Sequence, residues 1–465
     1  MTKNESTAII EPGPDTAPQG PDTALLTDHY ELTMVRAALA NGTAHRHSVF
    51  ELFPRRLPEG RRYGVVAGTG RAMDALRNFR FDDDTVAWLL DTDVVDQPTA
   101  DWLTDYRFRG NIWGYPDGEV YFPGSPLMVV EGSFAEAVVL ETVFLSIYNY
   151  DSAVASAASR MTMTAEGRPC IEMGSRRTSE RAAVAAARAA YIAGFDATSN
   201  LQAGREFGVP TTGTAAHSFT LLHDSESDAF AAQLAALGTD TTLLVDTYDV
   251  EAAVRTGIEL TKGKLGAVRL DSGDLSVTAK RTRAQLDELG AKDTRIIVTS
   301  DLDEWQIAAL SGSPVDGYGV GTSLVTGSGH PTCGFVYKLV ARATSADADA
   351  PLVPVAKKAT GKASVGGRKF ALRRLDDRGI AEAEVIGVGA KPKGDHNDRE
   401  LLVPLVTGGE IHDNPSLDVA RQRHADSIAE LPLEARKMSR GEPAVDTIYL
   451  ESDGDQAENP FAAKK

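Results

Sequence analysis

The chain has 465 residues, of which 42% are hydrophobic and 25% are charged, so it has enough apolar material for a large core and for more than one domain. Its formal net charge is -18 and no basic run compensates for it, which argues against nucleic-acid binding. Its two cysteines have no metal-ligand spacing, which argues against a zinc ribbon or a disulfide framework. We recognise neither a membrane-spanning run nor a signal sequence, so the expected location is the cytoplasm.

The first part of the chain predicts a disordered tail followed by a helix. Residues 1–22 are rich in Pro, Thr, Gly and acidic side chains, a composition that does not form a packed core. An amphipathic helix is expected at 30–39, with Thr27 and Asp28 before it as cap residues. Further on, we expect a strand at 49–53 and a strand pair within 118–130.

Seven short, mostly apolar runs bounded by polar residues, Gly or Pro follow and read as strands. They lie at 170–173, 193–196, 209–212, 242–245, 265–268, 295–298 and 315–318. Helix-like stretches separate most of them, and the clearest is the Ala-rich segment 180–193. Strands that alternate with helices favour parallel pairing through right-handed crossovers, so we predict a closed or nearly closed barrel.

In such barrels the reacting groups gather at the carboxyl ends of the strands. The segments that follow the predicted strands contain arginines, carboxylates, hydroxyls, glycines and one histidine: Arg176, Asp196, Thr214, His217, Asp246, Arg269, Asp271, Ser300, Asp301, Gly319, Gly321 and Thr322. Arginine binds phosphate or carboxylate through a planar fork, and glycines let backbone N–H groups approach phosphate oxygens. The set indicates an anionic, phosphorylated substrate.

Strand-like runs return after the barrel, at 336–341, 370–375 and 383–388, with exposed loops expected at 357–368 and 391–399. We interpret the two outer segments as one sandwich-like domain into which the barrel is inserted. The predicted α/β chain is therefore divided into a tail at 1–22, sandwich segments at 23–155 and 341–452, a barrel at 156–340, and a flexible tail at 453–465.

Several motifs together resemble nicotinate phosphoribosyltransferase. They are Leu-Leu-Thr-Asp-His-Tyr-Glu-Leu-Thr-Met at 25–34, Glu-Met-Gly-Ser-Arg-Arg at 172–177, Gly-Phe-Asp-Ala-Thr-Ser-Asn at 194–200, Gly-Thr-Ala-Ala-His-Ser-Phe at 213–219, Val-Arg-Leu-Asp-Ser-Gly-Asp at 268–274 and Gly-Val-Gly-Thr-Ser at 319–323. The resemblance implies a type II phosphoribosyltransferase, with an irregular barrel, a two-ended sandwich domain and a homodimer whose active sites lie at the subunit boundary.

The same resemblance implies the reaction and its residues. Such enzymes join nicotinate to 5-phosphoribosyl 1-diphosphate, coupled to ATP hydrolysis through a transient phosphohistidine, which matches His217. The implied nicotinate site contains Thr214 and Arg269 together with Tyr30 of the partner subunit. The implied phosphate site contains Arg176, Asp271, Ser300, Gly319, Gly321 and Thr322. Mg²⁺ is expected with the substrate phosphates, near Asp271 or Asp301, and no protein-only metal site is assigned.

Each residue also has a structural interpretation. A lone histidine is more often structural than catalytic, Arg269 could form a salt bridge with Asp271, and Tyr30 could simply pack. A Gly-x-Gly segment is common in tight turns. We expect the remaining candidates to be structural or exposed: His223, His45, His47 and Lys369, although Lys369 has the reach to contact phosphates. Met173 replaces an aromatic residue that would sandwich the ring, so a sulfur–aromatic contact is the alternative to stacking.

Two other functions stay open at this point. The accepted base could be nicotinamide if a carboxylate faced the amide, and Asp196 is the candidate. The barrel could also bind a phosphorylated metabolite without catalysis, although a binder requires neither His217 nor the pair of Arg269 and Asp271.

Overall fold

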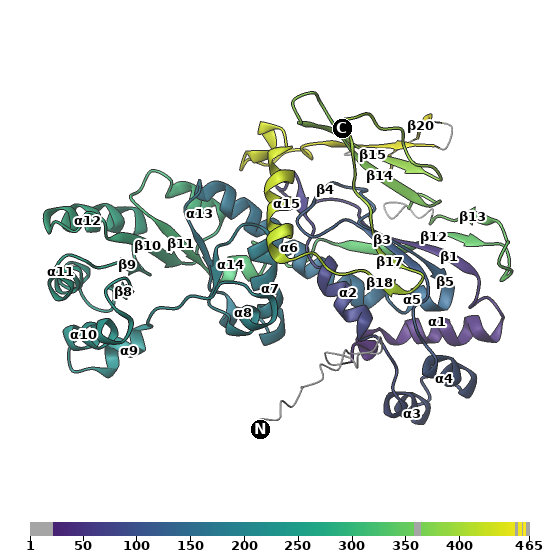
Figure 1. Cartoon of the computed structure of the whole chain (residues 1–465), viewed down its shortest axis with the longest axis horizontal. Coiled ribbons are helices and arrows are strands. Elements are labelled where there is room, and N and C mark those ends of the chain that lie inside the picture. The colour runs from purple at the N-terminus through teal and green to yellow at the C-terminus, as the bar shows by residue number, and fades with distance from the viewer. Residues whose placement is uncertain (1–21, 358–363, 452–453, 458, 462–465) are drawn as a thin grey trace, which may run out of the picture.

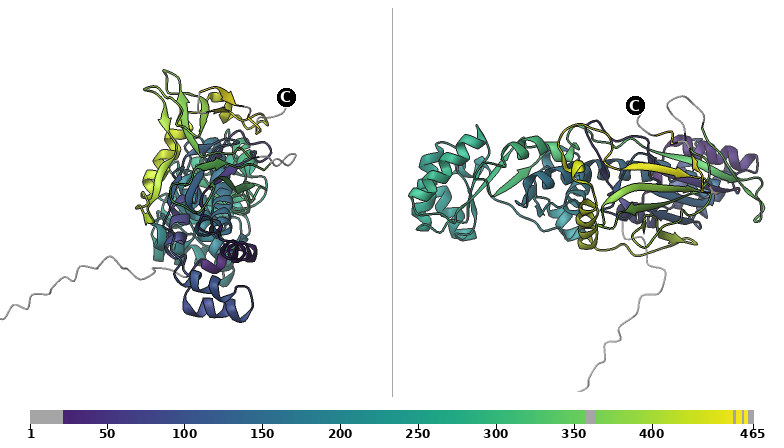
Figure 2. Two further views of the ribbon diagram at one scale, coloured as in Figure 1. Left: turned by 90° about the vertical axis from the view of Figure 1, so that its right-hand side faces the viewer. Right: turned by 90° about the horizontal axis from the view of Figure 1, so that it is seen from above.

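The computed structural model describes residues 22–357, 364–451, 454–457 and 459–461. Figures 1 and 2 show an elongated molecule, with a helix-rich lobe around a parallel sheet at one end and two further sheets at the other. The predicted α/β class, with an irregular barrel and a sandwich built from both ends of the chain, is confirmed. No helix in the described part of the chain is long and apolar enough to cross a membrane.

Seven strands from both ends of the chain form one sheet, in the order β13-β12-β1-β5-β3-β17-β18. β1 pairs antiparallel with both β12 and β5, so strands from the N-terminal and C-terminal parts of the chain lie side by side in one sheet. The strands are β1 His47–Pro54, β3 Asn111–Gly114, β5 Met128–Ser133, β12 Phe335–Ala343, β13 Leu352–Pro354, β17 Val403–Thr407 and β18 Glu410–Ile411.

A five-stranded sheet, in the order β16-β14-β15-β19-β20, forms the second layer. Its strands are β14 Lys369–Leu375, β15 Ala381–Val388, β16 Arg399–Glu400, β19 Asp446–Leu450 and β20 Gln456–Ala457, and β20 lies within the predicted C-terminal tail. The predicted strand pair within 118–130 is wrong, because β4 Val120–Tyr121 pairs with β2 Gly64–Val65 while β5 joins the larger sheet. Most of the predicted N-terminal tail and the centre of the predicted loop at 357–368 lie outside the described residues.

Lys369 is not the exposed residue that we expected. It begins β14, and its Nζ lies 2.8 Å from Oε2 of Glu51 on β1, with both side chains buried. Because β14 packs against the larger sheet, its first residue points between the two layers, where a cation requires a paired carboxylate. Lys369 therefore links the sheets and does not contact solvent.

The sequence analysis did not find most of the N-terminal helices. The helix predicted at 30–39 is α1 His29–Ala40, and a short helix, η1 Ala24–Leu26, precedes it. The other helices of this part are α2 Thr69–Arg77, α3 Asp83–Asp91, α4 Gln97–Thr104, α5 Phe134–Val138 and α6 Glu141–Ala165. The long α6 is buried along Ala and Ser residues, whose small side chains give a weak hydrophobic signal. Ser152 and Ser156 on α6 accept hydrogen bonds from the backbone N–H groups of Ala67 and Val65, which fixes β2 against the helix.

Six parallel strands form the half-barrel, in the order β7-β6-β11-β10-β9-β8. They are β6 Cys170–Glu172, β7 Ala197–Thr198, β8 Thr242–Leu244, β9 Ala267–Leu270, β10 Arg295–Ser300 and β11 Gly317–Val320. The predicted strand at 209–212 is reduced to one bridge, between Thr198 and Thr211. Of the two expected forms, closed or nearly closed, the closed one is not observed: β7 and β8 are edge strands, and the sheet curls without closing.

Helices cover this sheet, and one of them ties it to the other lobe. They are η2 Ser175–Arg177, α7 Glu180–Ile192, α8 Leu201–Phe207, α9 His217–Leu222, α10 Glu226–Leu237, α11 Val250–Thr261, α12 Leu275–Glu288, α13 Glu304–Ala309, α14 Thr322–Val325, α15 Leu417–Ala429 and η3 Leu433–Arg436. The predicted helix at 180–193 is α7. α15 lies between the lobes (Figure 1), and Arg421 on it donates to the carbonyl oxygens of Tyr191, Gly194 and Phe195 at the end of α7.

Arg373 on β14 is a stability determinant of the sandwich. Its guanidinium is fully buried and lies 2.8 Å from Glu384 and 3.7 Å from Glu119. Replacing it by Met leaves these carboxylates without their buried cation, so we expect Arg373→Met to lower the free energy of unfolding by about 3–5 kcal/mol. The neighbouring Arg374 is partly exposed and 3.8 Å from Asp398, so Arg374→Met is the matched control and should cost about 1 kcal/mol or less. Urea unfolding of both variants tests this, and equal losses would contradict the assigned role.

Candidate active site

A histidine lies over the carboxyl edge of the half-barrel because an arginine ties down the segment before it. Arg269 on β9 donates from Nη1 to Thr214 Oγ1 and from Nη2 to the Ala215 carbonyl oxygen, both at 3.0 Å. His217 is the first residue of α9, two residues beyond Ala215. The structure therefore brings together Thr214, His217 and Arg269, which we had selected from the sequence.

The imidazole of His217 is held at one nitrogen and open at the other. Nδ1 lies 3.0 Å from Thr247 Oγ1. Nε2 lies 4.0 Å from Asp246 Oδ1 and 4.0 Å from Asp271 Oδ2, and the side chain is 42% exposed. If Nδ1 carries the proton and donates it to Thr247, the Nε2 lone pair is free to attack an electrophile.

The two carboxylates differ in how they are held. Asp246 is almost completely buried, and its Oδ2 accepts hydrogen bonds from the Asp271 N–H at 3.0 Å and the Ser272 hydroxyl at 2.6 Å. Its Oδ1, which is the atom nearest His217, has no hydrogen-bond partner among the described residues. Asp271 is partly exposed and accepts a hydrogen bond from Thr299 on β10. The site therefore places negative charge beside Nε2, where it stabilises a positively charged imidazole.

Positive charge lies on the other side of the same edge. Burial lowers the pKa of Arg269, the charges of Asp271 and Asp246 oppose this shift, and Arg176 adds to it. The Nε of Arg269 is buried without a hydrogen-bond partner in the described part of the chain, and the alternative interpretation of Arg269, a salt bridge with Asp271, is not found there. Arg176 is exposed in η2. Two guanidinium groups are thus available for anionic substrate groups.

The other predicted phosphate residues lie on the adjacent strands. Ser300 ends β10 and pairs with Val320 of β11, so Gly319, Gly321 and Thr322 follow the same edge. A cavity of about 320 Å³ opens beside Ser300 and Asp301, and the start of α12 also lines it. These residues are close enough in the sheet to contact one extended substrate.

Tyr30 does not belong to this cluster within one chain. It lies on α1, at the opposite end of the molecule from α9 in Figure 1, and its side chain is 46% exposed. Partial burial and the charges of Glu141 and Glu31 raise the pKa of Tyr30 to about 12. The ring is therefore neutral and accessible, but only a second chain could bring it to His217.

Several sequence-based expectations are settled by the contacts of the residues concerned. Asp196 precedes β7, and its carboxylate accepts from the Cys170 N–H and from Arg421 at 3.0 Å, at the amino end of β6. It therefore does not face a base at the carboxyl edge. His223 is structural as expected, with its Nδ1 2.8 Å from the Phe219 carbonyl oxygen.

His45 and His47 are both exposed, as expected. Among the described residues, no group of three or more His, Cys, Asp or Glu side chains is placed to hold a metal ion. The His-x-His pair therefore has no set of ligands around it in this part of the chain.

Met173 packs against the backbone of the neighbouring strand. A Cβ built on Gly319 would lie 2.8 Å from Met173 Sδ, so the thioether covers this glycine. The sulfur of Met173 therefore lies against β11. The contact between this sulfur and the nicotinate ring stays a prediction.

Sequence reasoning gave no role to Asp246, Thr247 or Glu172. Asp246 and Thr247 lie two and three residues after the end of β8, so their position near a strand end was a usable signal. Glu172 is buried and accepts hydrogen bonds from Thr198 and from the Gly174 N–H, which holds the turn that carries Arg176. Burial raises the pKa of Glu172, and the hydrogen bonds oppose that shift.

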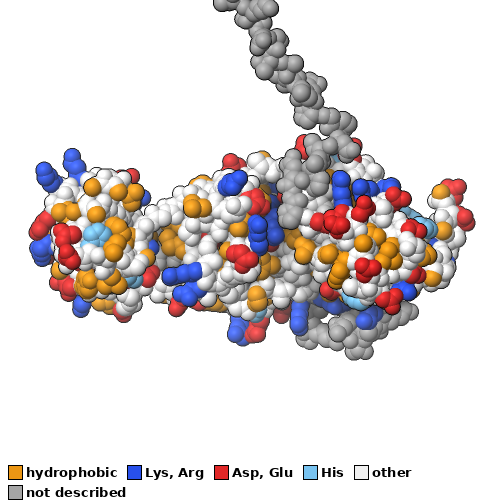
Figure 3. All heavy atoms as spheres, turned by 90° about the horizontal axis from the view of Figure 1, so that it is seen from below, with side chains coloured by type: hydrophobic (Ala, Val, Ile, Leu, Met, Phe, Trp, Pro, Cys, Tyr) orange, Lys and Arg blue, Asp and Glu red, His pale blue; other side chains and the backbone are white. Residues whose placement is uncertain are grey.

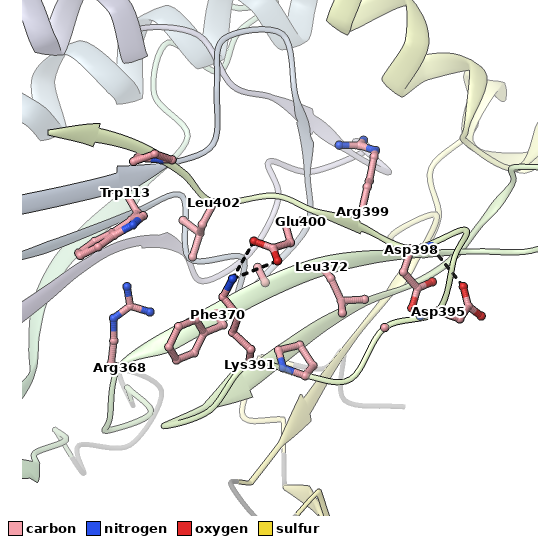
Figure 4. A pocket seen from close by; sticks show the side chains of 14 residues that line it. Trp113, Arg368, Phe370, Leu372, Lys391, Asp395, Asp398, Arg399, Glu400 and Leu402 are labelled. Carbon is pink, nitrogen blue, oxygen red and sulfur yellow. Dashed lines mark hydrogen bonds and ion pairs between the residues drawn. The ribbon is translucent and has the colours of Figure 1, made fainter. Parts of the chain in front are cut away.

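A second cavity, of about 350 Å³, lies in the sandwich, away from this cluster (Figure 4). The Arg368 guanidinium lies against the rings of Phe370 and Trp113 there, with 4.0 and 4.5 Å to the ring centres, and Lys391 pairs with Glu400 across the cavity. None of the predicted site residues lines it.

Comparison with known proteins identifies the family. Residues 25–149 match the model of the nicotinate phosphoribosyltransferase N-terminal domain. A nicotinate phosphoribosyltransferase of Mycobacterium tuberculosis (strain H37Rv) is 55% identical over 440 residues, which cover 92% of this chain and 96% of that protein. This chain belongs to the nicotinate phosphoribosyltransferase family. The Bacillus subtilis nicotinate phosphoribosyltransferase is 37% identical over 68% of this chain and 66% of that protein.

Solved structures agree with this family membership. Human nicotinic acid phosphoribosyltransferase superimposes with a TM-score of 0.76 at 26% identity, covering 91% of this chain and 97% of the human chain. Nicotinate-nucleotide pyrophosphorylase from Pyrococcus furiosus shares the fold, with a TM-score of 0.71 at 22% identity, covering 90% of this chain and 99% of that chain. The half-barrel with a two-ended sandwich is therefore the architecture of this family.

Gly319 gives a stability test of the packing at this edge. A Cβ there would lie 2.5 Å from Thr299 Cγ2 as well as 2.8 Å from Met173 Sδ. We expect Gly319→Ala to destabilise the protein by about 1–3 kcal/mol through overpacking. Gly312→Ala is the control, because nothing lies within 4 Å of its Cβ position. Denaturant unfolding measures both, and a Gly319→Ala variant as stable as the control would show that β10 and β11 have room to adjust.

Proposed function

We propose that the protein transfers the phosphoribosyl group of 5-phosphoribosyl 1-diphosphate to nicotinate, giving nicotinate mononucleotide and diphosphate for NAD biosynthesis. ATP hydrolysis is coupled to this transfer through a phosphohistidine at His217. Family membership supports the reaction. The observation that carries the coupling is the position of His217 Nε2 between Asp246 and Asp271, with Nδ1 held by Thr247.

The chain's own residues fit the phosphoryl step. His217 Nε2 attacks the γ-phosphorus of ATP, the bond to the bridging oxygen breaks, and ADP leaves. The phosphorylated ring keeps the proton on Nδ1 and donates it in a hydrogen bond to Thr247 Oγ1. The ring therefore carries a positive charge. Asp246 and Asp271 stabilise that charge, and water then hydrolyses the N–P bond during the cycle.

The transfer step needs positioning more than covalent help. Loss of diphosphate from the anomeric carbon develops oxocarbenium character, and the pyridine nitrogen of nicotinate forms the new C–N bond. In our assignment, Arg269 and Thr214 bind the nicotinate carboxylate, and Arg176 binds the phosphates. Ser300, Gly319, Gly321 and Thr322 bind the phosphoribosyl end, supported by their common place on the carboxyl edge.

The residues fit a Mg²⁺ ion that arrives with the substrate phosphates. Asp271 and Asp301 offer the carboxylate oxygens that Mg²⁺ prefers, and both have exposed or partly exposed side chains at this edge. When bound, the ion would offset the charge of the departing diphosphate. With no group of three protein ligands among the described residues, water and phosphate oxygens would complete its coordination.

The working form is a homodimer in which Tyr30 of one chain stacks on the nicotinate bound by the other. Its exposed ring on α1 supports this assignment. Figure 3 shows apolar side chains on the outer surface of the half-barrel lobe, where Leu221 and Leu222 of α9 and Leu237 of α10 are exposed. Such a patch next to His217 is suited to contact with another chain.

We place the reaction in the cytoplasm. Cys170 and Cys333 are both buried and unpaired, which suits a reducing compartment.

The first test incubates the purified protein with Mg²⁺, 5-phosphoribosyl 1-diphosphate and either nicotinate or nicotinamide, with and without ATP. Nucleotide from nicotinate with matched ADP release is the expected result. Product from nicotinamide alone would move the assignment to the amide, and no product from either base would favour a binding protein. Chromatography separates the nucleotides.

His217→Ala should abolish ATP-coupled turnover and leave slow, ATP-independent transfer. We expect the coupled rate to fall by about two orders of magnitude or more, as when a group that acts in the chemical step is removed. His223→Ala is the control, because the His223 ring is hydrogen-bonded to the Phe219 carbonyl oxygen and packs against the Phe219 ring, away from the two carboxylates. Equal nucleotide yields with and without ATP in the native protein would contradict this mechanism.

Mixing two inactive variants tests the shared site. Tyr30→Ala and His217→Ala homodimers should each be weak, but a heterodimer contains one site with both native residues. After subunit exchange at equal amounts, about a quarter of the native activity should return, because half of random dimers are mixed and each has one intact site. No recovery, with exchange confirmed by mass spectrometry of tagged chains, would show that Tyr30 does not act across the interface.

A further inference from the structure

Glu31, the residue next to Tyr30, has a carboxyl group that is fully buried between α1 and α6. Its Oε1 accepts hydrogen bonds from the Thr142 N–H at 2.9 Å and from the Thr142 hydroxyl at 2.5 Å. Its Oε2 is in hydrogen-bonding contact with the Thr27 hydroxyl. The carboxyl therefore joins the start of α1 to the first turn of α6.

The number of protons in this cluster indicates the charge of Glu31. Thr27 Oγ1 contacts two acceptor atoms, Glu31 Oε2 and the Val139 carbonyl oxygen at 3.0 Å. A hydroxyl has one proton and cannot donate to both. Both contacts are satisfied if Glu31 is a neutral acid that donates from Oε2 to Thr27, while Thr27 donates to Val139.

The surroundings agree with a neutral acid. Glu31 forms no ion pair among the described residues, and Lys338 on β12 pairs with Glu141, with its Nζ 3.4 Å from Oε1. Burial raises the pKa of Glu31 to about 8, the Thr142 hydrogen bonds oppose this shift, and Glu141 and Asp28 add to it. The ionisable groups that face Glu31 from the packed elements are Asp28, Tyr30, Tyr106, Glu141, Tyr337 and Lys338.

The same contacts reach Tyr30. Its phenol lies close enough to Thr142 and Glu141 for both groups to shift the pKa of Tyr30. Glu31 and Tyr30 are adjacent on α1, and both lie near the first turn of α6. A negative charge on Glu31 would lie beside Glu141 and Asp28 in a buried site, which disfavours this packing.

We propose that Glu31 is a positioning residue that, as a neutral acid, fixes α1 and the ring of Tyr30 for nicotinate binding, and that its ionisation in alkaline solution releases them. This inference rests on the proposed function of Tyr30. A carboxyl group with a raised pKa stabilises the fold fully below its unfolded pKa, and this contribution is lost as the pH rises through the folded pKa. The loss therefore falls between about pH 4.5 and 8 for Glu31.

The test compares the native enzyme with Glu31→Gln from pH 6.5 to 9.5, with Mg²⁺, ATP and 5-phosphoribosyl 1-diphosphate saturating. The amide keeps the oxygen that accepts from Thr142, donates an N–H to Thr27 and never ionises. For the native enzyme we expect the KM for nicotinate to rise about tenfold for each pH unit above the transition, with little change in kcat. Glu31→Gln should show a flat KM.

Two further measurements separate the possible failures. Infrared difference spectra of native protein and Glu31→Gln near pH 7 should show a protonated carboxyl stretch only in the native protein. The native melting temperature should fall relative to that of Glu31→Gln as the pH rises. Glu59→Gln, at an exposed ion pair, is the control and should behave as the native enzyme.

The absence of a protonated-carboxyl band from the difference spectrum of native protein and Glu31→Gln, or a KM profile that the variant does not flatten, would overturn the inference. So would a profile flattened by Glu141→Gln and not by Glu31→Gln. If the native protein makes no nicotinate mononucleotide at any pH, the proposed function fails and the positioning role fails with it. The infrared and melting measurements would still show whether Glu31 is neutral.

Discussion

The hydrogen bonds from Arg269 to Thr214 and Ala215 determine where His217 lies. The segment before α9 makes only one β-bridge to the half-barrel in the described structure, so it has little regular pairing to hold it. The guanidinium on β9 replaces that pairing and places His217 over Asp246 and Asp271. An open sheet thereby gains a defined site at the edge where a closed barrel would have another strand.

Charged groups are buried both in the sandwich and at the carboxyl edge of the half-barrel. In the sandwich, the buried Arg373 pairs with Glu384, and the partly exposed Arg399 pairs with the buried Glu119, so the second pair joins the two ends of the chain. At the half-barrel edge, Asp246 Oδ1 is buried without a hydrogen bond, which costs stability but places an acceptor beside Nε2. The first arrangement stabilises the fold, whereas the second leaves an acceptor free beside His217, as the proposed phosphoryl transfer would require.

The two lobes are joined by specific contacts. α6 starts beside α1 in the sandwich and continues to β6 of the half-barrel, while Arg421 of α15 caps the end of α7 through three carbonyl oxygens. Tyr30 is nevertheless at the end remote from His217. Under the proposed function, a site that uses both residues would require two chains, so the packing of α1 on α6 would matter to the site of the other subunit.

The sequence alone was enough for the α/β class, for α1 and α7, for most strands of the half-barrel, and for the grouping of Thr214, His217, Arg269 and Asp271. These depend on local signals: short apolar runs, an Ala-rich helical stretch, and polar residues that follow strands. Only the tertiary structure decided that the barrel stays open, that β4 and β5 join different sheets, that Lys369 is buried, and that Asp196 binds Arg421 at the amino end of β6. Each of these depends on partners distant in the chain, and the free energy of burying or pairing a group is set by those partners and not by its neighbours in sequence.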